Sequence, residues 1–189
     1  MKTKDSKVKK ISQTRLRNVA LWYLDRFGGT RARVRQALKR RIRQAEEVHG
    51  PSPEAKSWMD SITDELERLG LINDAEFAAS RVQRGLRMHK SRRAIAHDLK
   101  QAGVEKHVAD SAIREVFTND SELDLRSAAA YVERKRIGHL RENPSQYYDK
   151  DLARMARRGF SYDISRRALV GDLKIERAKT PRGSMHKLT

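Results

Sequence analysis

The chain has 189 residues, of which 42 are Lys or Arg and 25 are Asp or Glu, so its formal net charge is +17 at pH 7. A surplus of that size predicts attraction to a polyanion, either a nucleic acid or an acidic protein. The absence of cysteine excludes disulfides and thiolate metal sites, and no apolar run suits a signal peptide or a membrane span. We therefore expect a soluble, cytoplasmic protein that makes no membrane contact.

The first part of the chain predicts three helices. Apolar residues at helical spacing occupy Leu16–Phe27, and Gly28-Gly29 ends this first helix. Thr30 is a suitable N-cap for a second helix, which has an apolar stripe on one side and a dense row of cations on the other. After the break Gly50–Pro53, a third amphipathic helix follows and ends at Gly70.

The middle part of the chain predicts three more helices. Asn73 is expected to cap the first of them while the Glu76 side chain reaches back to its backbone, as in a capping box. Ser91 caps the next helix, and Gly103 ends it. Apolar residues at helical spacing within Val104–Val116 mark the last helix of this part.

The third part of the chain has the same plan. We predict helices over Ala128–Ile137, over Asp149–Arg158 and from Ser161 to about Leu173, with a loop around Asn143–Ser145. No segment alternates apolar and polar residues over the length of a reliable strand. The predicted fold class is therefore all-α.

Weak internal repeats divide the chain further. A pattern of Ala, then an apolar residue at the fifth position and Arg at the seventh, occurs three times, at Ala20–Arg26, Ala78–Arg84 and Ala128–Arg134. Leu99–Val104 and Met155–Phe160 also align without a gap. We interpret these matches as three tandem three-helix repeats, residues 15–71, 72–118 and 119–173, in an elongated, curved array between flexible basic tails, residues 1–14 and 174–189. Chance similarity within a helical protein rich in Ala, Leu and Arg is the alternative.

Clusters of cations are the candidate binding residues for a partner or DNA. They are Arg31, Arg33, Arg35, Lys39, Arg40 and Arg43; Arg81, Arg84, Arg87, Lys90, Arg92 and Arg93; and Arg157 and Arg158. Few carboxylates accompany the first cluster along the chain, so we expect its self-repulsion to be relieved by a bound anion. The alternative is a solvated helix surface covered by long cationic side chains.

Other chemistry-bearing residues point to no catalytic function. The histidines are scattered, and Gly28-Gly29 has neither a preceding strand nor a phosphate-loop pattern. We expect no catalytic, metal or cofactor site and no enzyme activity. Trp22 lies off the first apolar stripe, and packing against a neighbouring repeat is favoured over a role as an exposed contact.

Three segments together carry a family resemblance: Leu69–Ala78, Ser91–Leu99 and Arg157–Ser161. In this order they resemble the RecX family of bacterial recombinase regulators, over residues 16–173. The chain departs from the family pattern in the long Gln44–Lys56 connection and in Met88–Lys90, where the family often has a glycine-rich turn. Both departures concern local loop geometry.

The resemblance implies a partner and an activity. It implies a curved array of three-helix repeats that inserts into the groove of a RecA-type recombinase filament on DNA. Such a protein would modulate, and most simply inhibit, the ATPase, the growth and the strand exchange of the filament. We expect a monomer without cofactor that also contacts single- or double-stranded DNA.

Two other functions agree with the composition. One is a sequence-tolerant, basic DNA- or RNA-binding protein that acts without a recombinase, whose affinity would fall steeply with salt. The other is a helical scaffold for an unrelated acidic protein, which would bind neither the filament nor DNA.

Overall fold

The structure is a computed structural model that describes residues 8–117 and 122–172. Within these ranges the chain forms helices and no strands, and the predicted all-α class is confirmed. The chain divides into two compact units, Met1–Ser121 and Glu122–Thr189. The predicted curvature of the array stays a prediction.

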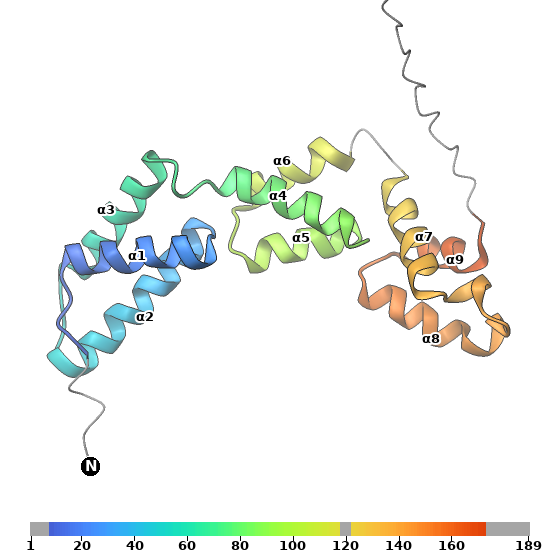
Figure 1. The fold of residues 1–189 in the computed structure, drawn as a ribbon, viewed down its shortest axis with the longest axis horizontal. Coiled ribbons are helices and arrows are strands. Elements are labelled where there is room, and N and C mark those ends of the chain that lie inside the picture. The colour runs from blue at the N-terminus through green and yellow to red at the C-terminus, as the bar shows by residue number, and fades with distance from the viewer. Residues whose placement is uncertain (1–7, 118–121, 173–189) are drawn as a thin grey trace, which may run out of the picture. The chain divides into compact units, whose positions relative to one another are not determined.

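The first three helices of unit 1 are α1 (Gln13–Phe27), α2 (Arg31–His49) and α3 (Ala55–Arg68). They contact one another pairwise and form a three-helix group (Figure 1). The predicted N-cap of α2 is confirmed, because the Thr30 hydroxyl accepts a hydrogen bond from the Arg33 N–H at 3.3 Å. Gly28, with φ of 59°, ends α1 as expected, since this backbone conformation suits a residue without Cβ.

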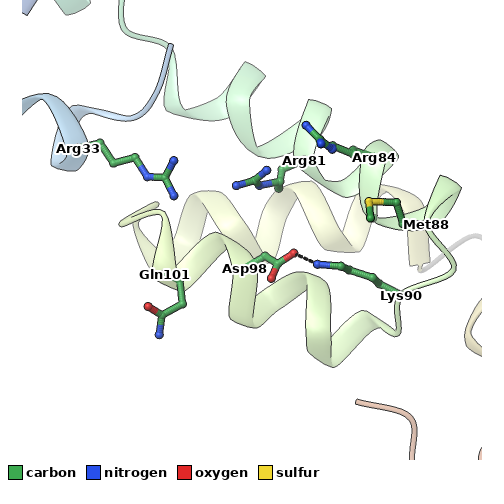
Figure 2. A pocket seen from close by; sticks show the side chains of 8 residues that line it. Arg33, Arg81, Arg84, Met88, Lys90, Asp98 and Gln101 are labelled. Atoms are coloured by element: carbon green, nitrogen blue, oxygen red, sulfur yellow. Dashed lines mark hydrogen bonds and ion pairs between the residues drawn. The ribbon is translucent and has the colours of Figure 1, made fainter. Parts of the chain in front are cut away.

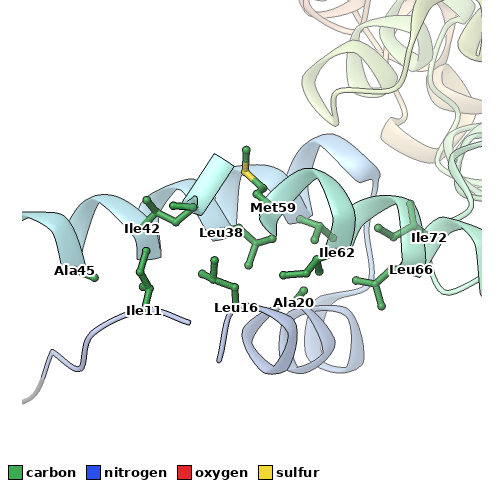
Figure 3. Close-up of a cluster of buried hydrophobic side chains, with 12 residues drawn as sticks. Ile11, Leu16, Ala20, Leu38, Ile42, Ala45, Met59, Ile62, Leu66 and Ile72 are labelled. Carbon is green, nitrogen blue, oxygen red and sulfur yellow. The ribbon is translucent and has the colours of Figure 1, made fainter. Parts of the chain in front are cut away.

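The core of this group is built from the predicted apolar stripes. Leu16, Leu38, Ile62 and Leu66 are buried among neighbours from all three helices (Figure 3). Ile11, which lies in the predicted N-terminal tail, is also buried in this core. A shared apolar face of this kind holds thin amphipathic helices together in a chain with few aromatic residues.

The second group of unit 1 contains α4 (Asp74–Arg87), α5 (Arg92–Gln101) and α6 (Lys106–Phe117), and α4 contacts both of the others. The Asn73 side chain caps α4 by accepting the Glu76 N–H at 3.0 Å. The Glu76 carboxylate accepts a 3.4 Å hydrogen bond from the Asn73 side-chain amide, so the expected return to the Asn73 backbone is wrong.

Unit 2 contains α7 (Leu123–Lys135), the short 3₁₀ helix η2 (Gly138–Leu140), α8 (Pro144–Arg157) and α9 (Tyr162–Val170). The predicted loop around Asn143–Ser145 is wrong, because Pro144 occupies the first turn of α8. Proline suits that position, since its fixed φ is helical and its missing N–H would have had no partner there. The end of the last predicted helix, Leu173, and residues 1–7 and 174–189 of the predicted tails lie outside the described residues.

A buried carboxylate organises unit 2. Asp151 on α8 is 1% exposed and accepts two hydrogen bonds from the Arg141 guanidinium, at 2.7 and 2.9 Å. It also accepts the Gly138 N–H at 3.1 Å, so one side chain ties η2 and the following loop to α8. The hydrogen bonds from Arg141 lower the pKa of Asp151, because they favour the ionised form.

Candidate polyanion-binding site

The two helix groups of unit 1 meet at the N-terminus of α2. The Thr30 hydroxyl, buried at this point, donates a 2.6 Å hydrogen bond to the carbonyl of Ala102, next to the end of α5. The Arg31 N–H donates to Asp74 at the start of α4, at 2.9 Å. Burial raises the pKa of Asp74, while this backbone hydrogen bond acts in the opposite direction. These contacts fix the first turn of α2 against α4 and α5.

A cavity of about 360 Å³ lies beside this junction. Its walls come from α2, α4, α5 and the turn between the last two helices, through Arg33, Arg81, Arg84, Gly85, Met88, Lys90, Asp98 and Gln101. Figure 2 shows the guanidinium groups of Arg33 and Arg81 extending toward one another from different helices. The fold therefore joins a residue of the first predicted cation cluster to three residues of the second.

The lining of this cavity has more cations than carboxylates. Its one carboxylate, Asp98, forms an ion pair with Lys90. Within the described residues, Arg33, Arg81 and Arg84 form no ion pair, and the buried Nε of Arg81 has no hydrogen-bond partner. Like charges that face one another repel. An anion with several acceptor oxygens would relieve that repulsion and accept hydrogen bonds from the free N–H groups. Phosphate groups have this chemistry.

The remaining cations of the first cluster are in two different environments. Arg31 forms ion pairs with Asp64 and Glu67, and Arg35 forms one with Asp60, all from α3. The hydrogen bond that the Arg31 guanidinium donates to Asp64 raises the pKa of Arg31. The expectation that few carboxylates accompany this cluster is wrong for these two arginines, because tertiary packing supplies carboxylates that are distant in sequence. The other members of the cluster are exposed on α2: Lys39, Arg40 and Arg43.

The other predicted binding residues do not line the cavity. Arg87 and Arg93 are exposed near the turn between α4 and α5, and Arg92 lies 5.9 Å from the ring centroid of Phe117. The last two belong to unit 2, where Arg157 is exposed and the Arg158 guanidinium lies 4.6 Å from the ring centroid of Tyr131. That both residues bind the same partner as the cavity stays a prediction.

An aromatic cluster at the end of α1 differs from its predicted packing. Trp22 is 57% exposed and Phe27, the last residue of the predicted buried stripe, is 60% exposed. Their ring centroids lie 5.8 Å apart, so Trp22 contacts its own helix and the preferred interpretation, packing against a neighbouring repeat, is wrong. Trp22 lies about 200° around the helix from the buried Ala20, which is the signal in the sequence that it faces solvent.

Residues 8–117 and 122–172 contain neither a candidate metal site nor a candidate membrane span. No group of three or more His, Asp or Glu side chains there could hold a metal ion. Across the same ranges, every helix is too short or too polar to traverse a bilayer.

Comparisons with known proteins agree with the sequence resemblance. Residues 73–113 match the family model described as RecX, second three-helix domain. The regulatory protein RecX of Myxococcus xanthus is 32% identical over 165 residues, which cover 85% of this chain and 87% of that protein. The regulatory protein RecX of Agrobacterium fabrum is 28% identical over 156 residues, covering 82% and 81%.

A solved structure supports the fold. The crystal structure of RecX from Lactobacillus salivarius superposes with a TM-score of 0.60 and 23% identity, over 83% of this chain and 94% of that chain. Fold and cavity together define a class of protein, basic and all-helical, with three-helix groups and a cation-lined cavity at the junction of two of them. Within that class, the chain belongs to the RecX family of regulatory proteins.

Proposed function

We propose that this protein binds RecA-type recombinase filaments on DNA and inhibits their ATPase, growth and strand exchange. Family membership supports a regulatory role, since the relatives carry the name regulatory protein RecX. The net charge of +17 suits a partner that contains DNA. The absence of a catalytic constellation in the sequence argues for a binding protein, with ATP hydrolysis belonging to the partner.

One observation supports the choice of the cavity as the binding surface. Arg33, Arg81 and Arg84 converge on one cavity from two helix groups, and no described carboxylate pairs with them. In contrast, Arg31 and Arg35 are bound to α3 and stabilise the first group. We therefore place the contact with the DNA-bound filament at the cavity, with its three unpaired arginines facing phosphate or acidic side chains.

The test is ATP hydrolysis by a RecA-type recombinase preassembled on saturating single-stranded DNA while this protein is titrated in. We expect the rate of ATP hydrolysis to fall when far less than one copy of this protein is added per recombinase subunit. Excess DNA should not restore the rate. Loss that extra DNA abolishes would support the alternative, a basic DNA-binding protein that only competes for the strand. No loss at all would contradict the proposal.

A pair of triple variants tests the surface. Replacing Arg33, Arg81 and Arg84 with Gln removes three charges from the cavity and should weaken the inhibition by roughly a hundredfold, since each lost charge-assisted contact contributes on the order of 1 kcal/mol. Replacing Lys39, Arg40 and Arg43 with Gln removes the same charge from exposed positions on α2. Equal losses in both variants would show that net charge, and not the cavity, determines binding. Circular dichroism would confirm that both variants keep their helices.

A further inference from the structure

The exposed aromatic cluster at the end of α1 has features of a binding surface. Trp22 and Phe27 are in edge-to-face contact, and the Tyr23 ring lies 5.3 Å from Phe27. Single exposed apolar residues are ordinary on protein surfaces. Here the Phe27 ring contacts two other aromatic rings, and Trp22 and Phe27 are mostly exposed, so the three form a patch that needs an explanation. Tyr23 packs partly on the core of the first helix group and so anchors the patch.

Cations adjoin this aromatic patch on two sides. The Arg26 guanidinium lies 5.7 Å from the Phe27 ring centroid. On the other side, a Cβ built on Gly29 would lie 3.7 Å from the Tyr23 ring and 3.6 Å from the Cβ of Arg33. Tyr23 and Arg33 therefore both border Gly29, and Arg33 extends from there into the cation-lined cavity. Asp25, an acidic residue of the same stretch of α1, is exposed.

We propose that the patch and the cavity form one site for single-stranded nucleic acid, in which bases stack on Trp22 and Phe27 while the backbone phosphates enter the cavity at Arg33, Arg81 and Arg84. Aromatic platforms next to a cationic groove are the combination that binds single strands, because unpaired bases expose their faces between regularly spaced phosphates. A duplex hides these faces in its stack. The site therefore prefers single strands over duplexes.

An acidic protein surface fits these observations less well. It would use the arginines of the cavity but would leave the exposed aromatic side chains of Trp22 and Phe27 without a matching group. This inference rests on the proposed function only in using the same cavity. The test below contains no recombinase in its first step, so either idea can fail without the other.

Trp22 itself supplies the measurement. The chain has two tryptophans, and the other, Trp58, packs half-buried against the core of the first helix group. In the Trp58→Phe variant of the full chain, the emission reports on Trp22 alone. We expect an oligodeoxythymidylate to quench it, and a duplex of equal length to do so much less. An abasic oligomer with the same number of phosphates should bind without quenching, because it offers no ring to stack.

Affinity measurements keep the inference testable if the single-tryptophan variant folds poorly. By fluorescence anisotropy with a labelled oligodeoxythymidylate, Trp22→Ala should weaken binding by roughly tenfold, the size typical of one lost base–aromatic stack. Tyr162→Ala is the matched control, because Tyr162 is an exposed aromatic residue on unit 2 that does not belong to the patch. It should leave the affinity unchanged.

Three results would overturn the inference. One is no quenching at saturating oligodeoxythymidylate, and another is equal quenching by the abasic oligomer, which would leave phosphate binding without stacking. The third is quenching that appears only when DNA-free recombinase is added, which would make the patch a protein contact.

Discussion

Asp151 is the centre of a group of hydrogen bonds within unit 2. Its carboxylate is buried, and Arg141 and the Gly138 N–H saturate it with hydrogen bonds. A carboxylate in this position contributes to stability only while it is ionised, because protonation removes the charge that its donors require. The residue is structural, since it connects η2 to α8.

The Asp151→Asn variant tests this role through pH. The folded-state pKa of Asp151 is lowered chiefly by Arg141, so its contribution is present above the ordinary carboxyl pKa of about 4 and is lost as pH falls through the lower folded value. We expect the substitution to lower the free energy of unfolding near neutral pH by about 2 kcal/mol, and by less in acid. Denaturant unfolding at several pH values measures both.

Asp149→Asn serves as the control for this experiment, because Asp149 is exposed on the same helix. It should change the free energy of unfolding little at any pH. A loss at Asp151 that stays constant down to the acid limit would show that packing, and not ionisation, is responsible.

At the scale of elements, the junction of α2 with α5 determines whether the cavity exists. The end of α5 approaches α2 so closely that a Cβ on Gly103 would lie 2.4 Å from the Cβ of Ala32. Thr30 joins the same two elements by its hydrogen bond to Ala102. Since Arg33 comes from α2 and Arg81 from α4, their convergence depends on this docking.

Gly103→Ala should therefore disturb the junction. Gly103 has φ of 77°, so alanine adds backbone strain of about 1 kcal/mol, and its overlap with Ala32 adds roughly 1–3 kcal/mol. The expected result is a lower free energy of unfolding together with weaker binding to single-stranded DNA. Thermal unfolding and anisotropy measure the two effects.

Gly70→Ala separates strain from overlap. Gly70 has a similar φ of 72°, but a Cβ there would meet nothing within 4 Å. Only the strain remains, so this variant should lose about 1 kcal/mol and keep its affinity. Equal behaviour of both variants would contradict a tight contact between α2 and α5.

For the whole molecule, the excess positive charge predicts binding that depends strongly on salt. Each phosphate that the protein neutralises on a single strand contributes about −0.7 to the slope of log affinity against log salt concentration. Replacing Arg33, Arg81 and Arg84 with Gln should make that slope shallower by about 2. The Lys39, Arg40 and Arg43 triple variant should change it less, and a larger change there would move the phosphate contact to the exposed side of α2.

Local chemistry in the sequence is sufficient to predict most of the helices and where they begin. Thr30, Asn73 and Ser91 act within their own turns, where a short polar side chain meets a free N–H three residues later, and each was predicted as a cap. The start of α8 was missed because Pro144 was interpreted as part of a loop, although proline is also favoured in the first turn of a helix.

The composition of the candidate site depends on contacts between residues that are distant along the chain. The sequence by itself determined the helical class, the repeats, the basic character and the resemblance to RecX proteins, because caps, periodicity and charge are local or additive properties. Only the tertiary structure decided that Arg31 and Arg35 are paired with α3 while Arg33 meets Arg81, and that Trp22 and Phe27 stay exposed. The physical reason is that ion pairs, cavities and exposure depend on which helices pack together, and that packing brings together residues many positions apart.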